Sequence, residues 1–197
     1  MCLETFTIVN FSIDFEFFIC KKPETQKNPN TPNGGKGIAM SEALTREKFL
    51  SRAEYETLSA TLIRNTLKAP RDTLLLLTSM HTGARPTEVL SILKSDLDPE
   101  KRTVFIRGLK GSRDREIPLQ ASIFQRLMII ARDKAPEEHI FPIALRTYQG
   151  IWHHYRPAKK GVRSLRHTFA IRLYEKTKDV RLVQMALGHR YLNTTQV

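Results

Sequence analysis

The side chains best suited to chemistry in this sequence are arginines, a lysine and histidines that fall in four short stretches. A guanidinium can bind two phosphate oxygens at once and stays charged throughout. A lysine ammonium is movable and has a tunable pKa, so it can donate a proton. The four stretches are Thr82–Leu90, Gly108–Leu119, Arg163–Ala170 and Leu187–Val197. Taken singly, each basic residue would be interpreted as a solvated surface charge, so only the ordered set is informative.

Other kinds of site find little support. His153, His154 and the remaining histidines have no carboxylate or cysteine partner at metal-ligand spacing, so we expect no metal site. The glycines of residues 33–37 lie in a linker rather than in a strand-to-helix turn, which argues against a nucleotide-binding loop. We therefore expect no cofactor and no small-molecule substrate.

The charge is strongly basic and unevenly distributed. The chain holds 32 Lys and Arg against 20 Asp and Glu, a formal net charge of +12. Residues 1–40 contain four lysines and four acidic residues, so the whole excess lies in 41–197. This balance favours a phosphate-rich partner, and we expect double-stranded DNA. Both cysteines lie before residue 41, so a disulfide framework is not expected and a cytoplasmic, nucleoid-associated protein is. No apolar run approaches the ~18 residues of a membrane span, so we expect no membrane partner.

Composition divides the chain at residue 40. Residues 1–20 are apolar and could form an edge strand, whereas 21–40 are rich in Lys, Pro, Asn and Gly, which is typical of a linker. We expect 1–40 to be disordered or loosely attached and 41–197 to form the folded domain. Two explanations of the first segment stay open: an ordinary flexible extension, or upstream read-through before a natural start at Met40.

The folded part is expected to be α+β and mainly helical, with one small β-hairpin. Ser51 and Glu54 fit a capping box at the start of a helix. The apolar run 74–80 predicts a buried helix that stops at Gly83, and Pro86 suits the first position of a helix through 94. Alternating residues predict strands at 102–108 and 113–119. Further helices are expected at 121–134, 163–177 and 179–187.

Thr82–Leu90 resembles the first arginine box of the tyrosine recombinases, the family that includes phage integrases. In that family the arginine emerges from a turn ahead of a helix and grips the scissile phosphate. The resemblance assigns this role to Arg85, and it assigns a supporting role to Glu88, three residues later.

Gly108–Leu119 is similar to the β-hairpin that carries the catalytic lysine of the same family. Lys110 is the matching residue and, by resemblance, would protonate the departing 5′ oxygen as a general acid. Arg113 and Arg115 are expected to contact DNA phosphates rather than to act as catalysts.

Arg163–Ala170 resembles the family pattern His-x-x-Arg, with Arg166 as the second arginine that clamps the phosphate. Arg163 stands where the family has histidine. An arginine can bind phosphate but cannot shuttle protons near neutral pH, so the general-base role is open. His167 is the alternative candidate for that role.

Leu187–His189 is similar to the last box of the family, in which the histidine hydrogen-bonds the phosphate and helps to orient the nucleophile. His189 is the match. The family's nucleophilic tyrosine follows nine positions later, at 198, so we expect the 197 residues to be inactive on their own. Tyr191 is interpreted as a packing residue.

The resemblance covers about residues 44–197 and implies a DNA-binding integrase or site-specific recombinase of a mobile element, which is a monomer off DNA. The alternative is a non-catalytic DNA-binding module that modulates a full-length recombinase. A basic RNA-associated protein is a third interpretation, which the few exposed-looking aromatic residues disfavour.

Overall fold

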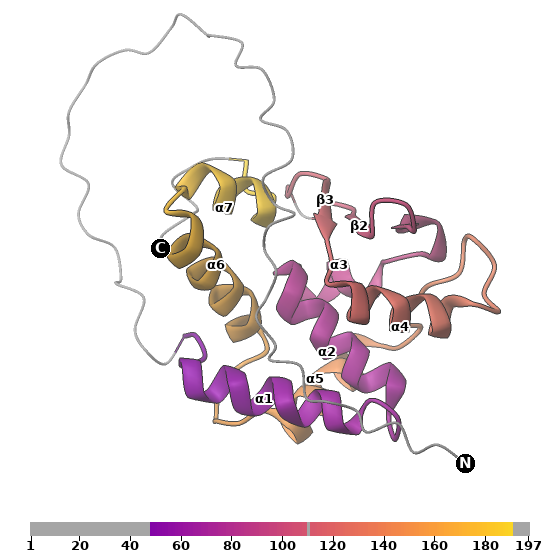
Figure 1. Ribbon diagram of the computed structural model, residues 1–197, viewed down its shortest axis with the longest axis horizontal. Coiled ribbons are helices and arrows are strands. Elements are labelled where there is room, and N and C mark those ends of the chain that lie inside the picture. Colours follow the sequence, from indigo (N-terminus) through magenta and orange to yellow (C-terminus); the bar gives the residue numbers. More distant parts are fainter. Residues whose placement is uncertain (1–47, 110, 191–197) are drawn as a thin grey trace, which may run out of the picture. The chain divides into compact units, whose positions relative to one another are not determined.

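The computed structural model describes residues 48–109 and 111–190, which form seven α-helices and one small sheet (Figure 1). The helices are α1 (Arg52–Asn65), α2 (Pro70–Thr82), α3 (Pro86–Leu90), α4 (Ala121–Ala131), α5 (Leu145–Tyr155), α6 (Arg163–Thr177) and α7 (Val180–Leu187). The strands are β1 (Leu97–Asp98), β2 (Thr103–Ile106) and β3 (Arg115–Pro118), preceded by a 3₁₀ turn at Lys94–Asp96. The expected mainly helical α+β fold is confirmed. The expected segment 1–40, its boundary at residue 40, and Tyr191 lie outside the described residues.

Helix α2 is the centre of the hydrophobic core. Figure 1 shows it among α1, α4 and α6, and it packs against all three. Its leucines from Leu74 to Leu77 are all buried, so this turn of the helix is enclosed on every side. Burying one such side chain contributes about 1.5–3 kcal/mol, which explains why a run with no amphipathic period still forms a helix.

The two ends of the α1–α2 unit form as the sequence predicts. The Ser51 hydroxyl accepts a hydrogen bond from the backbone N–H of Glu54, and the Glu54 carboxylate accepts one from the N–H of Ser51 at 2.7 Å. Helix α2 stops at Gly83, whose φ of +59° is in the left-handed region. A Cβ there would lie 2.3 Å from the Phe169 ring on α6, so only glycine lets the two helices approach.

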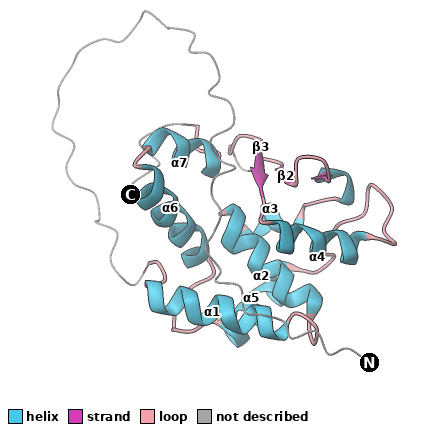
Figure 2. Ribbon diagram, in the orientation of Figure 1, coloured by secondary structure: helices cyan, strands magenta, loops and turns pink. Residues whose placement is uncertain are grey.

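The sheet is antiparallel with strand order β1-β2-β3. Figure 2 shows β2 and β3 near α3 and α4. Strands β2 and β3 form the predicted hairpin, pairing Val104 with Ile117 and Ile106 with Arg115. Alternation turns Val104, Ile106 and Ile117 inward, and it turns Arg115 inward with them. Strand β1 was not predicted because two residues are too few to show a period.

Two expectations about helices were wrong. The helix after Pro86 ends at Leu90 instead of continuing to 94, because the chain turns there and Leu93 pairs with His139 in an isolated bridge. Helix α5 was missed altogether. Its buried residues Tyr148, Ile151 and Trp152 have helical spacing, but the segment contains Gly150 and has no side-chain cap.

The remaining helices follow the sequence closely. Helix α6 has the expected bounds, and α7 begins after the N-cap Asp179, whose carboxylate accepts two backbone N–H bonds. Helix α4 ends at Ala131 rather than at 134. The carbonyl of Arg132, just after the end of the helix, accepts a hydrogen bond from the Lys94 ammonium. Within the described part of the chain, every helix is too short or too polar to cross a membrane.

Candidate active site

Glu88 is the centre of the candidate site. It lies in the first turn of α3 and its side chain is 0% exposed. Its Oε1 accepts a hydrogen bond from Nη1 of Arg85 at 2.9 Å, and its Oε2 accepts one from Nη2 of Arg115 at 2.7 Å. Nη1 of Arg166 lies 3.9 Å from the same Oε2. One buried carboxylate therefore contacts three guanidinium groups, which come from the turn before α3, from β3 and from α6.

This carboxylate is ionised at neutral pH. Burial by itself raises the pKa of Glu88, but the hydrogen bond and charge of Arg115, and then the hydrogen bonds from Arg85, lower that pKa below its usual value. With three guanidinium groups and one carboxylate, the cluster carries a net charge of about +2. It therefore attracts an anion such as a phosphate.

Arg85 reaches the site from the turn between α2 and α3. Its backbone N–H donates to Glu88 Oε2 at 2.9 Å, which fixes the turn, and its Nη1 also donates to the Ser112 hydroxyl at 2.8 Å. The side chain is 35% exposed. One edge of the guanidinium is thus held by the protein while solvent, or a ligand, can still reach the group.

Arg166 joins the ends of two helices. Its Nη1 donates to the carbonyl of Gly83 and its Nη2 to the carbonyl of Leu187, both at 2.8 Å. The side chain is 12% exposed. Burial, and then the charges of Arg85 and Arg115, lower the pKa of Arg166 to about 9, so the group remains protonated at neutral pH.

His189 follows the C-cap of α7 and faces Arg166, whose Nη2 lies 2.9 Å from its Nε2. A guanidinium can only donate, so Nε2 is the acceptor and the ring proton is on Nδ1. Burial, and then the charge of Arg166, lower the pKa of His189 to about 4. The imidazole is therefore neutral at neutral pH.

The end of the hairpin is hydrogen-bonded to Gly188, the residue before His189. The backbone N–H of Arg113 donates to the carbonyl of Gly188 at 2.8 Å, and the Ser112 hydroxyl donates to the same carbonyl at 3.1 Å. Gly188 has a φ of +71°, and a Cβ on it would lie 2.7 Å from the carbonyl oxygen of Arg113. Lys110 itself lies outside the described residues. The N–H of Ser112 donates to the carbonyl of Leu109 at 3.1 Å.

The predicted residues thus divide into two groups. The structure brings together Arg85, Glu88, Arg166 and His189. Arg163 is exposed at the start of α6, and the half-buried His167 has a pKa lowered by burial and then by Arg166. Neither belongs to the ion-pair network around Glu88 among the described residues.

Arg115, which is expected to contact a DNA phosphate, has a side chain that is 5% exposed and paired with Glu88. In the structure it therefore neutralises the buried carboxylate. The sequence held a signal for this, because strand alternation places Arg115 on the same face as the buried Ile117. Ser112 and Gly188 were not singled out by sequence reasoning, and their contact joins residues 76 positions apart.

No metal site accompanies this cluster in residues 48–109 and 111–190, where no three His, Cys, Asp or Glu side chains lie together. The groups at the site are guanidiniums, a neutral imidazole and a hydroxyl. Such a set binds and polarises a phosphate through hydrogen bonds and positive charge.

Fold and site together define a catalytic domain of the tyrosine recombinase type. Residues 48–197 match the Phage integrase family, and the chain belongs to that family. It is 29% identical over 163 residues to tyrosine recombinase XerA of Thermococcus kodakarensis, with 76% of this chain and 57% of that protein covered. It is 30% identical over 186 residues to XerH of Campylobacter jejuni, with 83% and 49% covered. The chain therefore spans about half the length of the curated relatives it matches.

Solved structures are consistent with this membership. The crystal structure of XerH bound to its difH substrate in a pre-cleavage complex is similar, with a TM-score of 0.58 and 29% identity over 75% of this chain and 49% of that one. The crystal structure of XerA recombinase has a TM-score of 0.63 at 22% identity, covering 75% and 57%, and shows the shared fold.

Proposed function

We propose that this chain binds double-stranded DNA and holds a backbone phosphate between Arg85 and Arg166, as the phosphate-activating part of a site-specific tyrosine recombinase. The observation that carries this proposal is the convergence of the two arginines on buried Glu88. The similarity to XerH supports it, because that protein's structure was solved with its DNA substrate.

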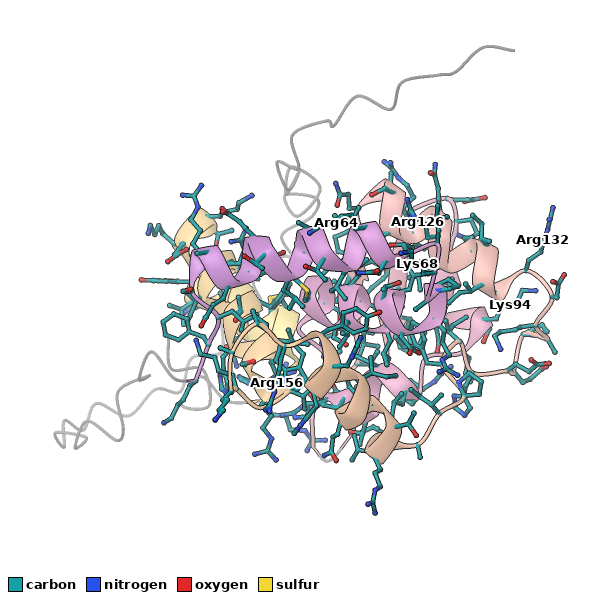
Figure 3. All side chains as sticks on the ribbon, turned by 90° about the horizontal axis from the view of Figure 1, so that it is seen from below. Arg64, Lys68, Lys94, Arg126, Arg132 and Arg156 are labelled. Atoms are coloured by element: carbon teal, nitrogen blue, oxygen red, sulfur yellow. The ribbon has the colours of Figure 1, made fainter. Side chains whose placement is uncertain are left out.

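The distribution of charge supports a polyanionic partner. Residues 139–174 contain no Asp or Glu and seven Lys or Arg, which are Arg146, Arg156, Lys159, Lys160, Arg163, Arg166 and Arg172. Figure 3 shows further basic side chains on α1 and α4, with Arg132 pointing away from the protein. Basic charge is therefore widespread, and only the buried network around Glu88 distinguishes a catalytic phosphate from general contacts with the DNA backbone.

The proposed roles follow from the geometry. Arg85 and Arg166 bind the non-bridging oxygens and stabilise the charge that develops on the pentacovalent phosphate. His189 adds a hydrogen bond from the side of α7, and exposed Arg113 contacts a neighbouring phosphate. By resemblance, Lys110 protonates the leaving 5′ oxygen.

No group in the cluster around Glu88 is assigned as the general base that removes the proton of the nucleophile. Arg163 lies where the family has its histidine, and His167 is the proposed substitute on α6. By resemblance, the nucleophile is expected at position 198. Phosphate binding, rather than strand cleavage, is the activity that the arginine cluster itself predicts.

Fluorescence anisotropy with a labelled ~30-base-pair duplex tests the proposal. Affinity should fall steeply between 50 and 300 mM salt, with a slope of about −0.9 per phosphate contacted. Arg85→Ala and Arg166→Ala should each weaken binding several-fold and lower the slope by about one contact, because each removes one positive charge. Arg132→Ala is the matched control, since it removes an exposed charge outside the cluster. Salt-insensitive binding, or equal losses in all three variants, would overturn the proposal.

A full-length recombinase is the proposed second partner. The arginine cluster would bind the DNA phosphate, and the partner would supply the tyrosine that attacks it. Mixing the chain with a competent relative and a cleavable duplex tests this. Arg166→Ala should abolish any complemented cleavage yet only weaken plain binding. Cleavage that is unaffected by Arg166→Ala would exclude a shared site.

The finer expectations also stand as proposals. They are a mobile-element origin, a monomeric state off DNA and association with the nucleoid. Analytical ultracentrifugation with and without duplex DNA tests the monomer, which should sediment as a 22.7 kDa species when DNA is absent.

A further inference from the structure

Ser112 occupies a position that the proposed roles do not use. It lies on the hairpin, two residues after Lys110, and it is buried. Its hydroxyl accepts a hydrogen bond from Nη1 of Arg85 at 2.8 Å and donates one to the carbonyl of Gly188 at 3.1 Å. One hydroxyl thus links the first arginine, the hairpin and the residue next to His189.

The direction of both hydrogen bonds is determined by chemistry. A guanidinium can only donate and a carbonyl can only accept, so the Ser112 hydroxyl must act as acceptor toward Arg85 and as donor toward Gly188. A side chain without both capacities breaks the link. A second hydrogen bond holds the hairpin against the segment after α7, because the N–H of Arg113 donates to the same Gly188 carbonyl at 2.8 Å.

The hydroxyl also completes the restraint on Arg85. Nη1 of Arg85 has two acceptors, Glu88 Oε1 and Ser112 Oγ, at 2.9 and 2.8 Å. These acceptors lie on α3 and on the hairpin, so two elements hold the guanidinium, and the acceptor on the hairpin is 27 residues from Arg85 in sequence. With Glu88 alone, the group could rotate about its Cζ–Nη1 bond more freely.

We infer that Ser112 is a positioning residue of this site. It orients the Arg85 guanidinium for phosphate, and it holds the lysine-bearing hairpin on the segment that carries His189. The part of this inference that concerns catalysis rests on the proposed function. The part that concerns the orientation of Arg85 can be measured without DNA.

The first experiment follows hindered rotation of the Arg85 guanidinium by ¹⁵N NMR. Ser112→Ala should speed exchange of its Nη1 protons roughly 3- to 10-fold, as expected for the loss of one hydrogen bond. Ser112→Thr should restore the slow rate, since threonine retains the hydroxyl. Ser91→Ala is the matched control because its hydroxyl bonds the Glu88 carbonyl and not Arg85. Arg172, which stacks on Tyr55, is the internal reference.

The second experiment titrates the same proteins with inorganic phosphate while the Arg85 and Arg166 signals are followed. Ser112→Ala should raise the dissociation constant several-fold, and Ser112→Thr and Ser91→Ala should leave it near the wild-type value. If Ser112→Ala fails to fold, Ser112→Cys has nearly the same shape with a much weaker hydrogen-bonding group and takes its place.

The outcomes separate the inference from the proposed function. Unchanged Arg85 rotation in folded Ser112→Ala overturns the inference, even if the protein binds duplex DNA. If the hydroxyl only filled space, Ser112→Ala would lower the stability of the protein without altering the rotation of Arg85, and that result would also overturn the inference. If wild-type protein binds no duplex DNA but Arg85 rotation depends on the hydroxyl, the proposed function fails and the positioning of Arg85 stands.

Discussion

Glu88→Gln removes the negative charge around which the site is built while keeping the size of the side chain. The carboxylate is fully buried and has Arg115, 5% exposed, as its closest charged partner. Breaking a buried ion pair by removing one partner costs about 3–5 kcal/mol, because the other charge stays buried. The glutamine carbonyl can still accept a hydrogen bond, which recovers about 1 kcal/mol. We therefore expect the free energy of unfolding to fall by about 2–4 kcal/mol at pH 7.

Urea denaturation followed by circular dichroism measures this loss. With a slope of about 1–3 kcal/mol per molar urea, the midpoint should shift down by about 1–2 M. Glu56→Gln is the control, since Glu56 forms an exposed i,i+4 pair with Arg52 and should produce no measurable shift.

The same comparison at lower pH tests the electrostatic origin of the loss. The folded-state pKa of Glu88 is below the value of about 4.5 for an unperturbed carboxyl, so its contribution to stability is present above pH 4.5 and disappears as pH falls through the folded-state pKa. The gap between wild type and Glu88→Gln should therefore narrow at pH 3.5. A loss below about 1 kcal/mol at pH 7, or a gap that is the same at both pH values, would refute the reasoning.

Two further predictions concern the segment after α7. Gly188→Ala should lower the melting temperature, because φ is +71° and the new Cβ would lie 2.7 Å from the carbonyl oxygen of Arg113; Gly150→Ala in α5 meets nothing within 4 Å and should raise it slightly. His189 should titrate near pH 4 in ¹H–¹⁵N NMR spectra, because burial and then the charge of Arg166 lower its pKa. As pH falls, the imidazole in the unfolded protein is protonated before the imidazole in the folded protein. The contribution of neutral His189 to stability should therefore be present above about pH 6.5 and be lost as pH falls toward 4. A ring that titrates near pH 6.5 would contradict the contact between His189 and Arg166.

Sequence patterns predicted the elements whose signals are local. The capping box of Ser51 and Glu54 spans three residues, and the stop at Gly83 follows from one residue that can adopt positive φ. Helix α5 and strand β1 were missed. The first contains Gly150 and has no side-chain cap, and the second is too short to carry a period.

The sequence also determined which side chains are available for chemistry. Arg85, Glu88, Arg166 and His189 were named from their motifs, and the structure brings them together. The ordered set of motifs, through its resemblance to the tyrosine recombinases, indicated a phosphate ligand, since a guanidinium binds phosphate oxygens. Strand alternation could have placed Arg115 inside, but its charge favoured the surface interpretation.

Only the tertiary structure decided how these groups are connected. Arg166 meets the carbonyl of Gly83 across 83 residues, and Ser112 meets Gly188 across 76. Such contacts depend on the packing of α2 against α6 and of α7 against β3. No local pattern encodes that packing, because it arises from the burial of apolar faces by the whole domain. The sequence by itself therefore determined the chemical groups of the site, and the folded core determined that Glu88 is buried among three arginines and that one serine hydroxyl joins the hairpin to the end of α7.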